Sequence, residues 1–78
     1  MRLTRHAKNN MRLYNILEMD IVKAIESPDS TDRESNKSIV LKSYTDKFSG
    51  FPLKVVYEEI GDEVMIVTAY PLKKKHWR

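Results

Sequence analysis

The stretch LKVVYEEIGDEVMIVTAY at residues 53–70 decides the fold of this chain. Two runs rich in β-branched and aromatic residues, Leu53–Ile60 and Glu63–Tyr70, flank the dipeptide Gly61-Asp62, which suits a two-residue hairpin turn. Counting back from that turn predicts three opposed pairs: Tyr57 with Ile66, Val55 with Thr68, and Leu53 with Tyr70. Since opposed residues share a sheet face, we expect Thr68 and Tyr70 beside Val55 and Leu53.

The residues before this hairpin add fewer strands. Ile39–Tyr44 alternates apolar and polar side chains and predicts one half-buried strand. Residues 29–38 are polar throughout, and they leave room for one short edge strand around Thr31–Glu34 within a loop. We therefore expect the sheet mainly within residues 39–70, with three or four antiparallel strands.

Two helices are predicted at the start of the chain. Thr4 can cap a first helix over Arg5–Tyr14, and Asn15 tolerates the left-handed conformation that ends a helix. A second helix is expected over Leu17–Ser27, because Pro28 stops it. Helical spacing predicts these core-facing side chains: Ala7, Met11, Tyr14, Leu17, Ile21, Val22, Ala24 and Ile25. The predicted fold class is α+β, with two N-terminal helices packed on one face of an antiparallel sheet.

Length and composition narrow the classes of protein. The 78 residues are expected to form a single domain, with a helical hairpin at 1–27, the sheet at 39–70 and a basic tail at 71–78. Having no cysteine excludes a thiolate zinc site, and having two glycines excludes a glycine-rich nucleotide loop. The two histidines lack metal-ligand spacing, so we expect no metal and no cofactor. Without an apolar membrane span or a signal-peptide pattern, the protein is expected in the cytoplasm, with no membrane partner.

The charge is concentrated at the two ends. Residues 1–12 hold four cations and no acid, as do residues 73–78, so residues 13–72 carry −5 within a chain of net charge +3. Such a pattern suits a polyanion. The candidate nucleic-acid-binding residues come from both ends and from two strands: Arg5, Arg12, Lys42, Lys54, Lys73, Lys74, Lys75 and Arg78. The alternative is that the ends are merely solvated and that the strand lysines protect a sheet edge.

Metal-independent cleavage of RNA needs a base, an acid and cations around the phosphate. His6 is expected in the first turn of the first helix, where the helix dipole favours a neutral imidazole that can act as base. The alternative is a histidine that donates a structural hydrogen bond. Thr68 is polar within an apolar run and needs a partner, so we predict that His6 lies near Thr68 or Tyr70.

Four segments carry a further pattern: Arg5–Arg12 (RHAKNNMR), Tyr14–Ile16 (YNI), Asp20–Asp29 (DIVKAIESPD) and Val64–Tyr70 (VMIVTAY). In these segments and in the order of its elements, the chain resembles a widespread uncharacterised family. That family is grouped with the RelE/ParE-like toxins and the barnase–colicin–RelE fold of metal-independent ribonucleases. The resemblance implies a RelE/ParE-like fold and directs attention to His6 and Thr68 first, and to Arg12 and Tyr70 next. It also implies that only Lys42, Lys54 and Tyr70 stand in for the catalytic residues of ribosome-dependent nucleases.

These inferences give one leading hypothesis and two alternatives. The leading hypothesis is a toxin-like protein that acts as a metal-independent endoribonuclease on RNA, with His6, Thr68 and Tyr70 as catalytic residues. The first alternative is a non-catalytic nucleic-acid-binding protein that uses the basic ends alone. The second is a protein-interaction module whose partner, such as an antitoxin or gyrase, covers an exposed sheet face.

Overall fold

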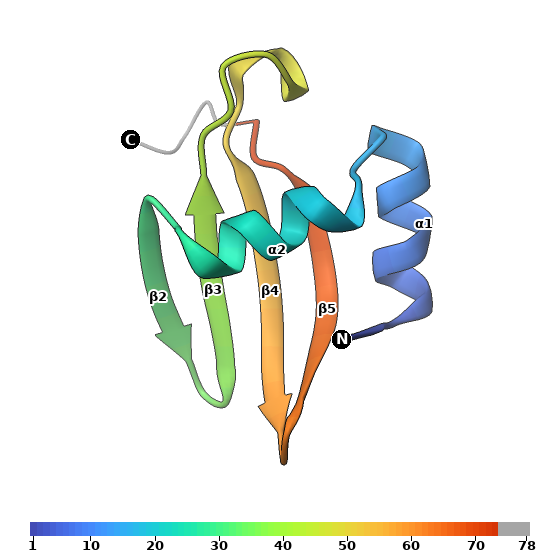
Figure 1. Cartoon of the computed structure of the whole chain (residues 1–78), viewed down its shortest axis with the longest axis vertical. Helices are drawn as coiled ribbons and strands as arrows, with labels where there is room; N and C mark the ends of the chain where they lie inside the picture. The colour runs from blue at the N-terminus through green and yellow to red at the C-terminus, as the bar shows by residue number, and fades with distance from the viewer. Residues whose placement is uncertain (74–78) are drawn as a thin grey trace.

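The computed structural model describes residues 1–73 and has two helices and one five-stranded sheet (Figure 1). Its elements are β1 (Arg2–Leu3), α1 (Arg5–Tyr14), α2 (Glu18–Glu26), β2 (Ser30–Glu34), β3 (Lys37–Lys42), the short 3-10 turn η1 (Phe48–Gly50), β4 (Leu53–Ile60) and β5 (Glu63–Pro71). The strand order is β1-β5-β4-β3-β2. The α+β class is confirmed.

The prediction of three or four antiparallel strands was wrong, because the sheet has five strands and is mixed. β1 runs parallel to β5, whereas the other neighbours are antiparallel. With two residues, β1 is too short to show an alternation in the sequence. β2 is an edge strand whose residues are all exposed, so it also lacks the apolar alternation that marks a strand.

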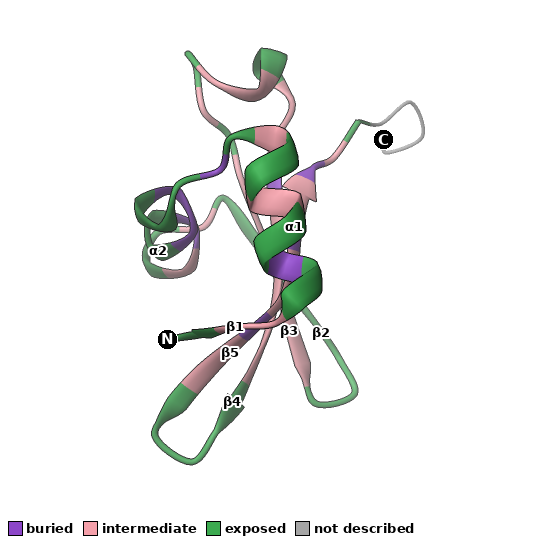
Figure 2. Ribbon diagram, turned by 90° about the vertical axis from the view of Figure 1, so that its right-hand side faces the viewer, coloured by how far each residue is buried: buried purple, intermediate pink, exposed green. Residues whose placement is uncertain are grey.

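The two helices occupy different places on the sheet. α2 crosses one face and contacts β3 and β4, whereas α1 lies along β5 at the edge of the sheet (Figures 1 and 2). The expectation that both helices cover one face was therefore only partly correct. Among residues 1–73, no helix or strand covers the opposite face, which we call the open face (Figure 2). Neither described helix has the length and apolar character needed to cross a membrane.

The core lies between α2, the inner side of α1 and the sheet. Its largest fully buried side chains are Ile21, Val40, Leu53, Val55 and Ile66. Two predicted core residues are exposed instead: Leu17 at 56% and Val22 at 38%. Leu17 precedes the first residue of α2 as its N-cap, and a helix of only nine residues buries a single narrow stripe.

A β-bulge changes the register of the final hairpin. Tyr57 is opposite Ile66, as predicted, but Val56 is opposite Thr68, which leaves Val67 without a partner. The predicted pairing of Val55 with Thr68 and of Leu53 with Tyr70 was therefore wrong. From Thr68 onward, each side chain of β5 therefore lies on the opposite face from the one that the regular register predicted. Ala69 and Pro71 are buried on the helix side, whereas Thr68 and Tyr70 lie half-buried on the open face.

Thr4 connects the start of α1 to this bulge. Its hydroxyl accepts a hydrogen bond from the backbone N–H of Ala7 at 3.0 Å, which confirms the predicted helix cap. The same hydroxyl donates to the carbonyl of the bulged Val67 at 2.7 Å, and the Thr4 N–H donates to the carbonyl of Ile66 at 3.1 Å. One residue thus sets both where α1 begins and how it sits on β5.

A buried carboxylate holds α2 to the segment between β3 and β4. The Asp20 side chain accepts from the N–H of Leu17 at 3.0 Å and from the Lys47 ammonium at 2.7 and 2.8 Å. The Tyr44 hydroxyl donates to the Asp20 carbonyl at 2.6 Å. Burial, and secondarily the Asp20 charge, raises the pKa of Tyr44 above its ordinary value.

Replacing Thr4 by valine should destabilise the protein by about 1–3 kcal/mol, because the helix cap and the bond to the Val67 carbonyl are lost together. Thr4→Ser keeps the hydroxyl and should stay within about 1 kcal/mol of the native chain. Urea unfolding of the two variants measures both values. Equal losses would show that the methyl group contributes as much as the hydroxyl, which would contradict this role of the hydroxyl.

The raised pKa of Tyr44 predicts how stability depends on pH. The folded protein holds the phenol proton more tightly than the unfolded chain, so this contribution is fully present below pH ~10 and is lost as the pH rises through the folded pKa. The free energy of unfolding should therefore fall more steeply above pH ~10 for the native chain than for Tyr44→Phe. If the free energies of unfolding of the two proteins fell in parallel above pH ~10, the raised pKa of Tyr44 would be contradicted.

Candidate functional site

The candidate site is the seam where α1 meets β5 on the side of the open face. Here the Asn10 side-chain amide of α1 donates a hydrogen bond to the Thr68 hydroxyl of β5 at 3.2 Å. Both side chains are half-buried. The bulge at Val67 is what brings Thr68 to this side, and bulges commonly re-aim a side chain next to a functional site.

Tyr70 extends the seam along β5, and Lys54 lies directly across from it on β4. The Lys54 ammonium sits 5.6 Å from the centroid of the Tyr70 ring, which is within the range of a cation–π interaction. Both residues are half-buried. The pairing therefore fixes a cation at a defined place on the open face without neutralising it.

The prediction that His6 would be the partner of Thr68 was wrong. Asn10 takes that role, and the His6 side chain is exposed. Asn10 was missed, although its position between Ala7 and Met11 made it a polar residue within the core-facing stripe. His6 precedes Asn10 by four residues, so the two share one side of α1. The imidazole therefore lies one helical turn before Asn10 on that side of α1.

The outward side of α1 is basic. Arg5, Lys8 and Arg12 are exposed, and α1 contains no acidic residue. None of these three cations takes part in an ion pair among the described residues, whose pairs are Arg2 with Glu63, Lys37 with Glu58 and Lys47 with Asp20. Among the described residues, α1 therefore presents uncompensated positive charge on the flank of the helix that faces away from Asn10.

The remaining predicted cations do not gather at the seam. The Lys42 ammonium donates to the carbonyl of Ser27 at 2.9 Å, just beyond the end of α2, so it stabilises a helix C-terminus on the covered face. Lys73 lies beyond the end of β5 and is exposed. Lys74, Lys75 and Arg78 fall outside the described residues.

The acidic residues are concentrated at the hairpin tip. Glu58, Glu59, Asp62 and Glu63 surround the β4–β5 turn, and residues 55–72 contain no lysine or arginine. In Figure 1 this tip is at the opposite end of the molecule from the loop that carries η1. Polyanion binding is therefore favoured along α1 and disfavoured at the tip.

The seam offers the contacts that phosphate and ribose groups use. It has an amide at Asn10, hydroxyls at Thr68 and Tyr70, an ammonium at Lys54 and an imidazole at His6. Phosphate contacts in nucleic-acid complexes come from such groups and from Arg and Lys. The arrangement holds no preformed hydrogen bond from His6 to Thr68 or Tyr70 among the bonds of residues 1–73. The seam is therefore a binding surface with one exposed acid–base group at its margin.

The bond between Asn10 and Thr68 should be measurable as a coupling energy. Asn10→Ala, Thr68→Val and the double variant should give a favourable interaction of about 0.5–1.5 kcal/mol in urea unfolding, since each single change removes the same hydrogen bond. Asn9→Ala, at the neighbouring exposed position, should show no coupling to Thr68. A coupling energy of zero for Asn10 would refute the contact.

Comparisons with known proteins give one family. Residues 3–71 match the family model DUF4258, described as a domain of unknown function. The match covers β1 to β5 and so includes the whole seam. No curated protein and no solved structure gives a significant match.

Proposed function

The chain belongs to the DUF4258 family, and we propose that it is a toxin-like protein of the RelE/ParE type that binds RNA and cleaves it without a metal. The order of its elements is compatible with this, because two helices precede the antiparallel part of the sheet. The sequence also resembles an uncharacterised family that is grouped with the RelE/ParE-like toxins, and this supports the proposal.

The observation that supports RNA binding most strongly is the acid-free outward side of α1. Arg5, Lys8 and Arg12 recur at intervals of three and four residues, so they follow one line along the helix. A line of unpaired cations suits a phosphate backbone, which repeats its charge along the strand. The seam, on the other flank of α1, supplies hydrogen-bonding groups for ribose and phosphate.

Cleavage is assigned to His6 as general acid or base. Its exposed imidazole stands next to Arg5 in the sequence and on the side of α1 that carries Asn10. Thr68 and Tyr70 orient the RNA, and Arg5 and Arg12 balance the charge of the phosphorane. In the non-catalytic alternative the same surface binds RNA but does not cleave it. A cleavage assay therefore separates the two hypotheses.

Binding of a protein partner, such as an antitoxin, is the second candidate function. The open face presents half-buried apolar side chains at Ile39, Leu41, Val56 and Met65, which no element of residues 1–73 covers. A partner on this face would lie beside the seam. Growth arrest that persists in variants unable to bind RNA would favour this candidate.

The proposal predicts salt-dependent RNA binding through α1. Replacing Arg5, Lys8 and Arg12 together by glutamine should weaken binding of a single-stranded RNA. It should also reduce the slope of log K against log salt by about 2, since each phosphate contact contributes roughly 0.7. Lys23→Gln, an exposed lysine of α2, serves as a control and should leave the slope unchanged. An unchanged slope in the triple variant would contradict binding through α1.

Cleavage is measured on the same preparation with labelled RNA. His6→Ala should lower the cleavage rate by about 10²–10⁴-fold while thermal unfolding stays close to that of the native chain. RNA binding without cleavage by the native chain would leave the non-catalytic alternative. Cleavage that falls only in proportion to the unfolded fraction would assign His6 a structural role.

A further inference from the structure

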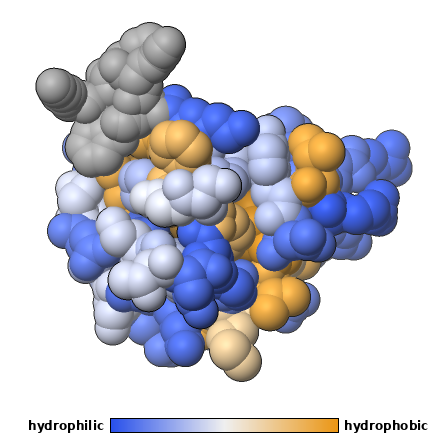
Figure 3. All heavy atoms as spheres, turned by 90° about the horizontal axis from the view of Figure 1, so that it is seen from above, coloured by the Kyte–Doolittle hydropathy of each residue, from blue (hydrophilic) through white to orange (hydrophobic). Residues whose placement is uncertain are grey.

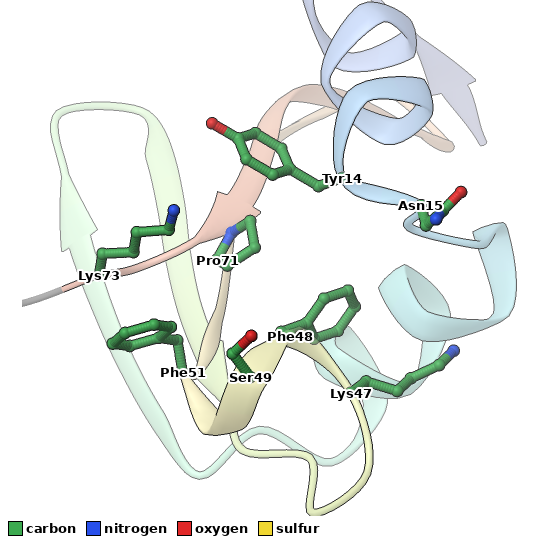
Figure 4. A pocket seen from close by; sticks show the side chains of 8 residues that line it. All are labelled: Tyr14, Asn15, Lys47, Phe48, Ser49, Phe51, Pro71 and Lys73. Carbon is green, nitrogen blue, oxygen red and sulfur yellow. The ribbon is translucent and has the colours of Figure 1, made fainter.

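A pocket of about 370 Å³ lies at the end of the molecule opposite the acidic hairpin tip (Figure 4). It forms where the end of α1, the loop around η1 and the end of β5 meet, and its walls include Tyr14, Phe48, Ser49, Phe51, Pro71 and Lys73. Seen from above, apolar side chains appear there among hydrophilic ones (Figure 3). Its volume is at the lower end of the range for small-molecule sites, about 300–1,000 Å³.

The loop that forms one wall holds an unfavourable backbone conformation. Phe48, Ser49 and Gly50 all have positive φ, at 57°, 53° and 82°. For the two non-glycine residues this costs of order 1–3 kcal/mol each, and such residues persist only where their surroundings hold them. Here Lys47 is bound to the buried Asp20. The contact between Lys47 and Asp20 therefore helps to hold the loop in this conformation.

The pocket wall at Phe48 is also fixed from behind. The Tyr44 ring meets the Phe48 ring edge to face, with centroids 5.5 Å apart, and the Lys47 ammonium is 5.8 Å from the Phe48 centroid. Tyr44 and Lys47 thus contact Phe48, and the Phe48 ring still lines the pocket. The aromatic surface is thus preorganised and needs no rearrangement to receive a ligand.

Two polar groups of the pocket lie on the same side. In Figure 4 the Tyr14 hydroxyl and the Lys73 ammonium turn to the same side, whereas Lys47 points away toward α2. Lys47 is neutralised by Asp20, at 2.7 Å. Lys73 is exposed, and no ion pair of Lys73 occurs among the described residues. The pocket therefore combines aromatic walls with one available cation at Lys73 and the hydroxyls of Tyr14 and Ser49.

We propose that this pocket holds a single nucleotide of the bound RNA, with its base against Phe48 and Phe51 and its phosphate at Lys73 and Tyr14. The inference rests on the proposed RNA binding and adds where an unstacked base is held. Base–aromatic stacking next to a cation is a general mode of single-strand recognition. α1 ends at Tyr14, which lines the pocket, so a strand that follows Arg5, Lys8 and Arg12 along α1 reaches the end of the helix that adjoins the pocket.

Three small probes test the assignment without RNA: adenosine monophosphate, adenosine and ribose 5-phosphate. We expect adenosine monophosphate to shift the NMR signals of the Tyr14, Phe48 and Phe51 rings, with adenosine binding about fivefold more weakly because the contact with Lys73 is missing. Ribose 5-phosphate should leave the Phe48 and Phe51 ring signals unshifted, since it has no base to stack. Shifts confined to α1 would overturn the proposal.

Two variants separate the base contact from the phosphate contact. Phe51→Leu keeps an apolar side chain but removes the ring, and it should weaken adenosine and adenosine monophosphate alike by roughly tenfold. Lys73→Gln should weaken only adenosine monophosphate, to the level of adenosine. Lys23→Gln is the matched control and should change neither affinity. A Lys73→Gln protein that still prefers the monophosphate would overturn the role of Lys73.

The result of the small-probe experiments is independent of the test of RNA binding by α1. If the α1 variants lose RNA binding but the native chain binds no adenosine monophosphate, the pocket assignment fails and the proposed function stands. If the probes bind in the pocket while the α1 variants retain the full salt slope, the basic line of α1 is the part that fails. To exclude unfolding as the cause of a loss, each variant is checked by its thermal unfolding midpoint.

Discussion

The hydroxyl of Thr4 is the contact on which the arrangement of this protein depends. It accepts from Ala7 and donates to Val67, so it joins the first turn of α1 to the one residue of β5 that has no partner on β4. The bulge leaves the Val67 carbonyl available to this hydroxyl. The bulge in turn decides that Thr68 and Tyr70 face away from α2. The position of α1 and the register of β5 are therefore linked through the two hydrogen bonds of the Thr4 hydroxyl.

This arrangement divides the polar residues between two faces with different roles. On the covered face, Lys42 caps the end of α2 and Asp20 holds Lys47, so these charges are used within the fold. At the seam and on the open face, Lys54, Thr68 and Tyr70 are only half-buried and make contacts that leave them accessible. The charges of the covered face are thus used within the fold, whereas the open face carries the accessible Lys54 as well as the Lys37–Glu58 ion pair.

Local signals in the sequence predicted local structure well. Thr4, Asn15 and the Gly61-Asp62 turn each act within a few residues, and the structure has the predicted helix cap, the left-handed residue at φ 56° and the hairpin. The bulge could not be predicted, because Val67 is β-branched like its neighbours and suits a regular strand equally well. That one residue moved Thr68 and Tyr70 to the other face and gave Thr68 a different partner. The candidate residues were thus identified while their geometry was not.

The acidic hairpin tip has a consequence for how the molecule meets another charged body. With four carboxylates at one end and the arginines of α1 along one edge, the protein has an electric axis. A polyanion repels the tip and attracts α1, so diffusing partners are turned before they touch. Most encounters then begin in a single orientation, and fewer collisions are wasted on the acidic end.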